Sequence, residues 1–414
     1  MSPVRVRPSP LHFKPFFPKH PSSAAVVAVA LAVYVFCCFL SSADLLGAHS
    51  ADVGYYGQLA RSMRDGAIPY RDLYVEYPPG ALPVFAAPAV SLHHYGDIFS
   101  VLMAICGALA LLVLASAARA LDMSDIELGR ALAPVAVAPF LLGGVFLNRY
   151  DPWPMLLSAL ALAALIRGRL GIGSGTLALA VVAKVYALAS VPVTVLYVVR
   201  CRGGPGLRRA ALVFAGVGAV LLVPFVLLGP GGVAFSLYEQ VTRNVEVESL
   251  SASALLVAGR LGLYHAHTIV GSLNSNDLVG AVPTVAGILT SCIALGSILA
   301  AAVWYWRGQA TRERFVLAFA VALVGYVTFG KVLSTQYMVW LLPIVPLVRG
   351  WVGHAATALL AVATWLTKLE YAHLDALARG TGLTLLVARN LTLVGLYVWL
   401  AVALRGRVRR AAVD

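Results

Sequence analysis

Long apolar runs recur along the whole chain, and they constrain its fold more than any other feature. The first extends from Ala24 to Leu40, and over the full sequence 60% of residues are hydrophobic whereas 12% are charged. Soluble domains carry about 25% charged residues, so this chain is predicted to lie in a membrane. Backbone polar groups inside a bilayer must be satisfied within each segment, which predicts helices. The runs lack the alternation of a membrane β-barrel.

The runs predict about twelve transmembrane helices, with both chain ends on the same side of the membrane. The predicted spans cover residues 24–42, 97–121, 131–147, 152–166, 170–183, 186–199, 210–229, 281–306, 315–329, 337–348, 352–369 and 385–404. Several are shorter than the ~20 residues that cross a bilayer, so some are expected to bend, tilt or cross only partly. The first run is long for a signal-peptide core of roughly 7–15 residues, which favours a retained span; the alternative is cleavage near Ser42.

Charge placement sets the predicted orientation. The net charge is +13, but the basic residues lie at the ends of apolar runs, which is typical of topology-setting charges and argues against a nucleic-acid partner. Residues 1–23 and 405–414 are therefore predicted to be cytoplasmic tails around a transmembrane domain at 24–404. The predicted orientation depends most on how residues 170–199 cross the membrane. Two spans with Lys184 at an outer tip preserve the pattern, whereas one kinked span with Lys184 buried would reverse everything downstream.

Two long connections, 43–96 and 230–280, fall on the predicted outer side. The stretch Asp52–Pro79 in the first contains four acids, three arginines and five tyrosines. Tyr55–Met63 is predicted to form a helix at the membrane surface that ends at Asp65-Gly66. Residues 81–92 follow as a second interfacial helix or half-span. So dense a polar and aromatic loop on an apolar chain is where we expect the chemistry, so 43–96 is the predicted catalytic loop.

Three motifs carry a resemblance to a known family. The first outer loop contains Asp52, Tyr55-Tyr56, Gly66-x-x-Pro69-Tyr70 and Glu76-Tyr77-Pro78-Pro79. Later come Asn148-Arg149-Tyr150-Asp151 and Lys331-Val-Leu-Ser334-x-Gln336-Tyr337-x-x-Trp340-x-x-Pro343. Together these resemble glycosyltransferase family 87, which comprises polytopic transferases of the GT-C superfamily that use polyprenyl-phosphate sugar donors.

The resemblance implies an all-α, GT-C-like membrane enzyme with interfacial helices in its first outer loop. It implies inverting transfer of a sugar, mannose first and arabinofuranose or another pentose as the alternative, to a glycolipid or lipid-linked glycan at the extracytoplasmic face of the plasma membrane. An acid in the first outer loop acts as catalytic base in such enzymes, and that role falls on Asp52. Asp72 and Glu76 are alternative bases, and Asp52 could also be a solvated interfacial residue. A carboxylate suits the role because a sugar hydroxyl must lose its proton as the new bond forms.

The remaining polar residues are candidates for substrate binding. The predicted set is Tyr55, Tyr56, Tyr70, Glu76, Tyr77, Arg149, Lys184, Arg243, Lys331, Gln336 and Tyr337. The tyrosines could stack on sugar rings or form an interfacial aromatic belt. Each cation could snorkel at a helix end, but a phosphate needs two or three converging cations, with Lys331 as the first candidate and Lys184 as the next. The Asn148–Asp151 turn could equally hold a salt bridge of its own.

No cofactor is expected, and a divalent metal is not favoured. His265 and His267 lack close carboxylate partners, although Glu246 and Glu248 keep the metal question open. The five cysteines have no metal-ligand spacing and predict no disulfide.

Two other functional classes remain as alternatives. A lipid or solute transporter would place ionisable groups near the membrane midplane and show paired halves. Here the charges cluster at the ends of spans, and the halves show no repeat. A non-catalytic membrane scaffold is the third class.

Overall fold

The protein is helical almost throughout, which confirms the predicted all-α membrane fold. The computed structural model describes residues 21–43, 51–270, 275–371 and 380–410. Most of the predicted cytoplasmic tails, residues 1–20 and 411–414, lie outside the described residues. Within these described residues, the one sheet is small and antiparallel, lies in the second long connection, and has the strand order β1-β3-β2. Its strands are β1 (Val245–Glu246), β2 (Thr268–Val270) and β3 (Asn276–Leu278).

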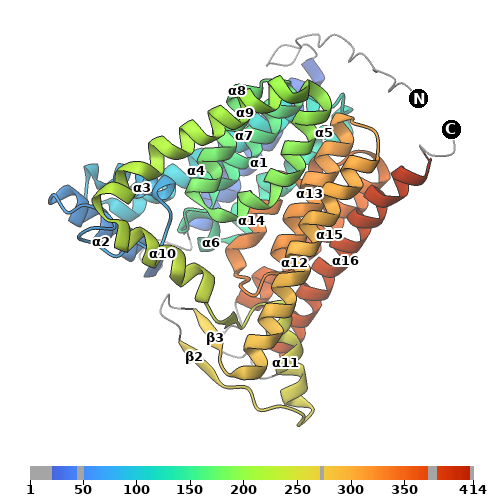
Figure 1. Ribbon diagram of the computed structural model, residues 1–414. Coiled ribbons are helices and arrows are strands. Elements are labelled where there is room, and N and C mark those ends of the chain that lie inside the picture. Colours follow the sequence, from blue (N-terminus) through green and yellow to red (C-terminus); the bar gives the residue numbers. More distant parts are fainter. Residues whose placement is uncertain (1–20, 44–50, 271–274, 372–379, 411–414) are drawn as a thin grey trace.

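Ten long helices build the bundle (Figure 1). They are α1 (Pro21–Ala43), α4 (Tyr95–Ala120), α5 (Asp125–Leu142), α7 (Pro152–Ile166), α8 (Leu170–Ala183), α9 (Val191–Leu228), α12 (Ala281–Arg307), α13 (Arg312–Phe329), α15 (Gly350–Tyr371) and α16 (Thr381–Arg410). The shorter helices are α2 (Ala51–Arg64), α3 (Leu82–Ala86), α6 (Gly144–Leu147), α10 (Pro230–Thr242), α11 (Leu250–Arg260) and α14 (Met338–Leu341). The 3-10 turns are η1 (Pro79–Ala81), η2 (Ala87–Val90), η3 (Val185–Ser190), η4 (Thr335–Tyr337) and η5 (Val345–Leu347).

Six segments of the described chain are long and apolar enough to cross a membrane, so the count of twelve spans stays a prediction. One of the six, Val185–Leu228, makes two passes, because the helix breaks at Gly203, which has a positive φ of 66°. The predicted span 337–348 differs most from expectation. It is divided into α14 and η5, and Met338–Leu342 are at most 1% exposed, so this segment packs inside the bundle.

The predicted hairpin at 170–199 is present. α8 ends at Ala183, Lys184 adopts an extended backbone, and the chain resumes as η3 and α9. Arg200 then donates to the carbonyl of Trp306 at 2.8 Å, at the far end of the bundle from Lys184. Two passes therefore flank Lys184, and the alternative of one kinked span is wrong.

The arginines that predict the orientation gather at one end of the bundle, where they also cap helices. Arg167 donates to the carbonyl of Ser116, Arg312 to that of Ala120 and Arg349 to that of Asp122. These carbonyls lie at or just past the end of α4, where backbone acceptors lack a partner within the helix and cations are favourable. The same residues that predict topology therefore also terminate helices.

The elements of the two long connections lie at the other end, which we call the polar end. Figure 1 shows α2, α3, α10, α11 and the sheet gathered away from the start of α5 and the end of α16. The predicted interfacial helix is α2, which ends at Arg64, directly before Asp65-Gly66. The predicted second helix at 81–92 is present as η1, α3 and η2.

Gly80 fixes the approach of η1 to the end of α8. A Cβ at this position would lie 2.6 Å from the backbone nitrogen of Ala183, closer than any real contact. The Gly80 carbonyl also accepts a hydrogen bond of 3.1 Å from the indole of Trp153 in α7. Gly80 therefore lets the connection 43–96 pack directly against α7 and against the end of α8, just before Lys184.

We predict that Gly80→Ala lowers the melting temperature of the detergent-solubilised protein by several degrees. Overpacking against backbone typically costs about 1–3 kcal/mol, because the backbone must shift. Gly54→Ala is the matched control, since a Cβ at Gly54 meets no atom within 4 Å and alanine favours a helix. Equal melting temperatures for the two variants would show that the close approach does not matter.

Candidate active site

A cavity of about 300 Å³ opens at the polar end, between the first outer loop, the start of α7, the end of α8, the sheet and η4. Nine of the twelve residues predicted for the site line it: Asp52, Tyr56, Glu76, Tyr77, Arg149, Lys184, Arg243, Gln336 and Tyr337. The structure therefore brings together residues that are up to 285 positions apart in the sequence, counting from Asp52 to Tyr337.

Asp52 sits in the first turn of α2 and forms an ion pair with Arg149, with 3.0 Å between its Oδ2 atom and the guanidinium. The start of a helix favours a negative charge. Burial alone would lower the pKa of Arg149, but the Asp52 carboxylate and its neighbours more than compensate and raise it. The pair joins the connection 43–96 to the turn before α7.

Lys184 forms a second ion pair with Asp151, whose Oδ1 lies 2.7 Å from the ammonium. The same oxygen accepts a hydrogen bond of 2.6 Å from the indole of Trp340. The Lys184 ammonium also lies 4.5 Å from the ring centre of Tyr150 and 5.1 Å from that of Trp340, a cation–π arrangement. Burial lowers the pKa of Lys184, whereas Asp151 raises it.

These two pairs decide how the Asn148–Asp151 turn is interpreted. The alternative of a salt bridge within this turn is wrong. Arg149 pairs with α2 and Asp151 pairs with the residue after α8. The turn therefore presents one cation and one acid to different partners across the cavity.

Glu76 reaches the cavity from a backbone segment that α10 holds in place. Its carbonyl accepts from the hydroxyl of Ser236 at 3.1 Å and from the amide of Gln240 at 3.3 Å. Burial raises the pKa of the Glu76 carboxyl to about 7, although Arg243 and Lys184 act in the opposite direction. Glu76 therefore changes charge near neutral pH.

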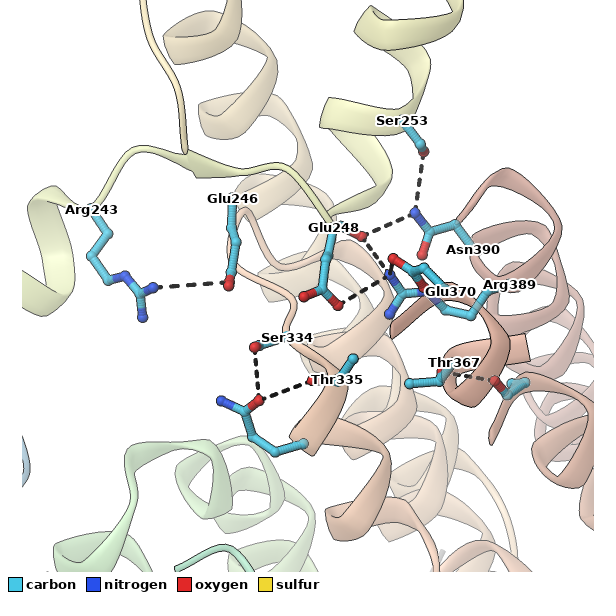
Figure 2. Close-up of polar contacts among 12 residues, drawn as sticks. Arg243, Glu246, Glu248, Ser253, Ser334, Thr335, Thr367, Glu370, Arg389 and Asn390 are labelled. Carbon is cyan, nitrogen blue, oxygen red and sulfur yellow. Dashed lines mark hydrogen bonds and ion pairs between the residues drawn. The ribbon is translucent and has the colours of Figure 1, made fainter. Parts of the chain in front are cut away.

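Glu246 of β1 and Glu248, two residues further on, form an acidic wall of the cavity, drawn in Figure 2. Arg243 lies 3.9 Å from Glu246, and Arg389 of α16 lies 3.6 Å from Glu248. Arg389 is itself fully buried and hydrogen-bonded at 3.0 Å to Glu370 of α15. Burial raises the pKa of Glu246 to about 8, and it also raises that of Glu248.

Three predicted site residues lie outside the cavity. The hydroxyl of Tyr55 donates to the carbonyl of Tyr74, and that of Tyr70 donates to the carbonyl of Tyr77. Both side chains therefore stabilise the backbone of the connection 43–96 and do not line the cavity. Lys331 lines a neighbouring groove of about 380 Å³, and its ammonium donates to the carbonyl of Val241 at 2.8 Å.

The tyrosines of the loop do not form an interfacial belt. Tyr56 is 1% exposed, stacks on Phe85 with 4.3 Å between ring centres, and meets Tyr77 and Tyr150 edge to face. Such pairs stabilise packing beyond the area that they bury. This aromatic cluster borders the Asp52–Arg149 pair.

Several lining residues were not predicted for the site. The polar and aromatic ones are Tyr150, Asp151, Tyr186, Gln240, Glu246, Glu248, Ser275, Asn276, Tyr326, Ser334, Thr335, Trp340 and Tyr371. Ser334 and Trp340 lie within the late motif, which is therefore the signal in the sequence that points to them. Tyr186, Tyr326 and Tyr371 lie in or beside apolar helices and carry no such signal.

The chain is similar to one family of known proteins. The model of glycosyltransferase family 87 matches residues 74–335. No curated protein matches the sequence. Among solved structures, the chain is similar to the crystal structure of ArnT from Cupriavidus metallidurans bound to undecaprenyl phosphate. That similarity has 17% sequence identity and a TM-score of 0.48, and it covers 94% of this chain and 77% of that one.

We predict that Asp151→Asn destabilises the protein more than the double variant Asp151→Asn/Lys184→Met. The single change leaves the buried ammonium without its counter-charge, and breaking a buried pair costs about 3–5 kcal/mol. Removing both charges restores most of that loss. Thermal unfolding of the two variants and of Lys184→Met closes the cycle; strictly additive losses would show that the two side chains are not coupled.

Proposed function

The chain belongs to glycosyltransferase family 87, and from this we propose that it transfers a sugar from a polyprenyl-phosphate donor to a glycolipid or lipid-linked glycan. The proposed sugar is mannose, with arabinofuranose as the alternative, and the proposed site is the extracytoplasmic face of the plasma membrane. The observation that carries the mechanism is the Asp52–Arg149 pair at a cavity where three cations meet.

In this proposal Asp52 is the catalytic base. The ion pair engages its Oδ2 atom, which leaves Oδ1 to accept the proton of an acceptor hydroxyl. As that oxygen attacks the anomeric carbon, the bond from that carbon to the phosphate oxygen breaks. Its electron pair leaves with the lipid phosphate, and a single displacement inverts the anomeric centre. A positioned base typically contributes a factor of about 10²–10⁴ in rate.

Cations stabilise the departing phosphate, so the leaving group needs no general acid. Asp151 pairs with Lys184 at 2.7 Å and Asp52 with Arg149 at 3.0 Å, whereas Arg243 lies 3.9 Å from Glu246, so the charge of Arg243 is the least neutralised of the three. Arg243 also lines both the cavity and the neighbouring groove that contains Lys331. We therefore assign the phosphate to Arg243, with Arg149 on the cavity side and Lys331 on the groove side.

The groove fits the apolar tail of such a donor. Ala294, Leu295 and Ile298 of α12 line it together with Val241 and Val332. Leu295 and other residues on the same face of α12 are exposed, so the groove opens toward the surrounding lipid. A polyprenyl chain lying here would bring its phosphate to Arg243 and its sugar into the cavity.

We predict that Asp52→Asn reduces transfer of labelled mannose from polyprenyl-phosphate-mannose by at least about 100-fold, because the amide cannot take the proton. Asp65→Asn is the matched control, since Asp65 is exposed in the same loop and does not line the cavity. Full activity in Asp52→Asn would refute the assignment. Movement of sugar or lipid across liposomes without any transfer would favour the transporter instead.

We predict that donor affinity rises as the pH falls through 7. Glu76 has a pKa of about 7, so it is neutral below that pH and adds a negative charge to the cavity above it. The donor is a phosphodiester that stays monoanionic, so its attraction to the cavity strengthens by roughly threefold to tenfold at the acidic end. Binding measured between pH 5.5 and 9 checks this. Glu76→Gln should remove the step near pH 7 and leave the step near pH 8 that Glu246 contributes in the same cavity; an unchanged pH profile in that variant would contradict the prediction.

A further inference from the structure

The acidic wall of the cavity has hydrogen-bonding capacity that the protein does not use. Glu246 is 7% exposed and Glu248 is 8% exposed, and both line the cavity. The Oε2 atom of each is buried without a hydrogen-bond partner among the described residues. Their arginine neighbours stand at 3.9 and 3.6 Å, beyond hydrogen-bonding distance. Because buried polar atoms are almost always hydrogen-bonded, these two oxygens call for a ligand.

The segment that carries these acids is held rigidly. The backbone N–H of Glu246 donates to the carbonyl of Lys331 at 3.1 Å. The carbonyl of Glu248 accepts from Arg389 at 3.0 Å and from Asn390 at 3.2 Å, both in α16. Figure 2 shows the two carboxylates extending from this segment on the same side, toward Ser334 and Thr335. The wall is thus preorganised rather than a loose cluster of acids.

Gln336, in the late motif, lines the same cavity as the acidic wall and carries an amide that can donate hydrogen bonds. The side-chain oxygen of Gln336 accepts a hydrogen bond of 2.7 Å from Ser334 and one of 3.5 Å from Thr335. With its oxygen engaged, the amide NH₂ is the part of Gln336 that is left to donate to a ligand. The carboxylates of Glu246 and Glu248 and the amide of Gln336 therefore line the same cavity, together with Tyr371 and Asn276.

This chemistry selects among the ligands that a transferase cavity could hold. Ionised carboxylates repel a phosphate, so the wall suits the anionic end of the donor least where Glu246 is charged, above a pH of about 8. Sugar hydroxyls both donate and accept, so they can satisfy the carboxylate oxygens and the amide together. A divalent cation is the competing ligand. However, no group of three or more His, Cys, Asp or Glu side chains in the described part of the chain is arranged to hold one.

We propose that Glu246, Glu248 and Gln336 form the subsite for the sugar ring of the acceptor, which is therefore an uncharged glycoside at this position. The inference rests on the proposed function and deepens it. The phosphate of the donor binds to Arg149 and Arg243. The acceptor binds against the acidic wall and presents a hydroxyl to Asp52.

Binding of soluble glycosides to the purified full-length protein tests this without requiring turnover. The neutral probes are propyl α-mannoside, propyl α-glucoside and propyl α-arabinofuranoside, followed by saturation-transfer NMR, with mannose 6-phosphate as the anionic probe. At least one neutral probe should bind, and mannose 6-phosphate should bind more weakly. Glu246→Gln and Glu248→Gln should each weaken binding of the neutral probe by about 5- to 30-fold, because a hydrogen bond from the sugar to the carboxyl group is lost.

Asp277→Asn is the matched control. Asp277 is buried in β3 opposite Glu246 but does not line the cavity, so this variant should bind the glycoside like the wild type. Decaprenyl phosphate, measured by its shift of the melting temperature, should bind the glutamine variants at least as tightly as the wild type, because these changes remove an acid and no cation.

Four outcomes would overturn the subsite. They are no binding of any neutral probe, unchanged binding in both glutamine variants, a parallel loss of decaprenyl phosphate binding, or glycoside binding that requires Mn²⁺ and disappears with EDTA. Intact glycoside binding without any sugar transfer would instead refute the proposed reaction and leave the subsite standing.

Discussion

The pairing of buried charges is the constraint on which the polar end of this protein depends. An ion removed from water is stable only with a counter-charge or hydrogen bonds close by. Each pair here joins segments that are distant in the sequence: Asp52 with Arg149, Asp151 with Lys184, and Arg389 with Glu370 and Glu248. The same contacts that compensate the desolvation of these charges thus bring α2, the start of α7, the end of α8, the sheet and α16 around one cavity.

Much of this arrangement follows from local patterns. Apolar runs predict the long helices, and basic clusters predict which helix ends lie together, because both depend on composition at one place in the chain. Polar residues that follow or precede an apolar segment are easy to single out in the sequence, and four of them, Asp52, Arg149, Lys184 and Arg243, line the cavity. These residues are costly near a membrane, so their presence is itself a signal of function.

What could not be predicted is the choice of partner. The sequence places Arg149 and Asp151 two residues apart, yet they face different elements, because a tight turn before α7 separates their side chains. Lys331 is the first candidate for the phosphate from the sequence, but it lines the groove beside the cavity and not the cavity itself, and its ammonium donates to the carbonyl of Val241 there. Strands as short as β1 and β3 carry no periodic signal, so the shared face of Glu246 and Glu248 emerged only with the fold.

The cavity mixes charges of both signs, and this bears on how the proposed transferase would hold its substrates. Arg149, Lys184 and Arg243 line it together with Glu76, Glu246 and Glu248, and Arg243 lies only 3.9 Å from Glu246. Burial raises the pKa of Glu76 to about 7 and that of Glu246 to about 8, so the charge of the cavity becomes more positive as the pH falls through this range. In the proposed reaction an anionic donor would therefore be held most strongly when these acids are protonated, whereas sugar hydroxyls can hydrogen-bond to the acids in either protonation state.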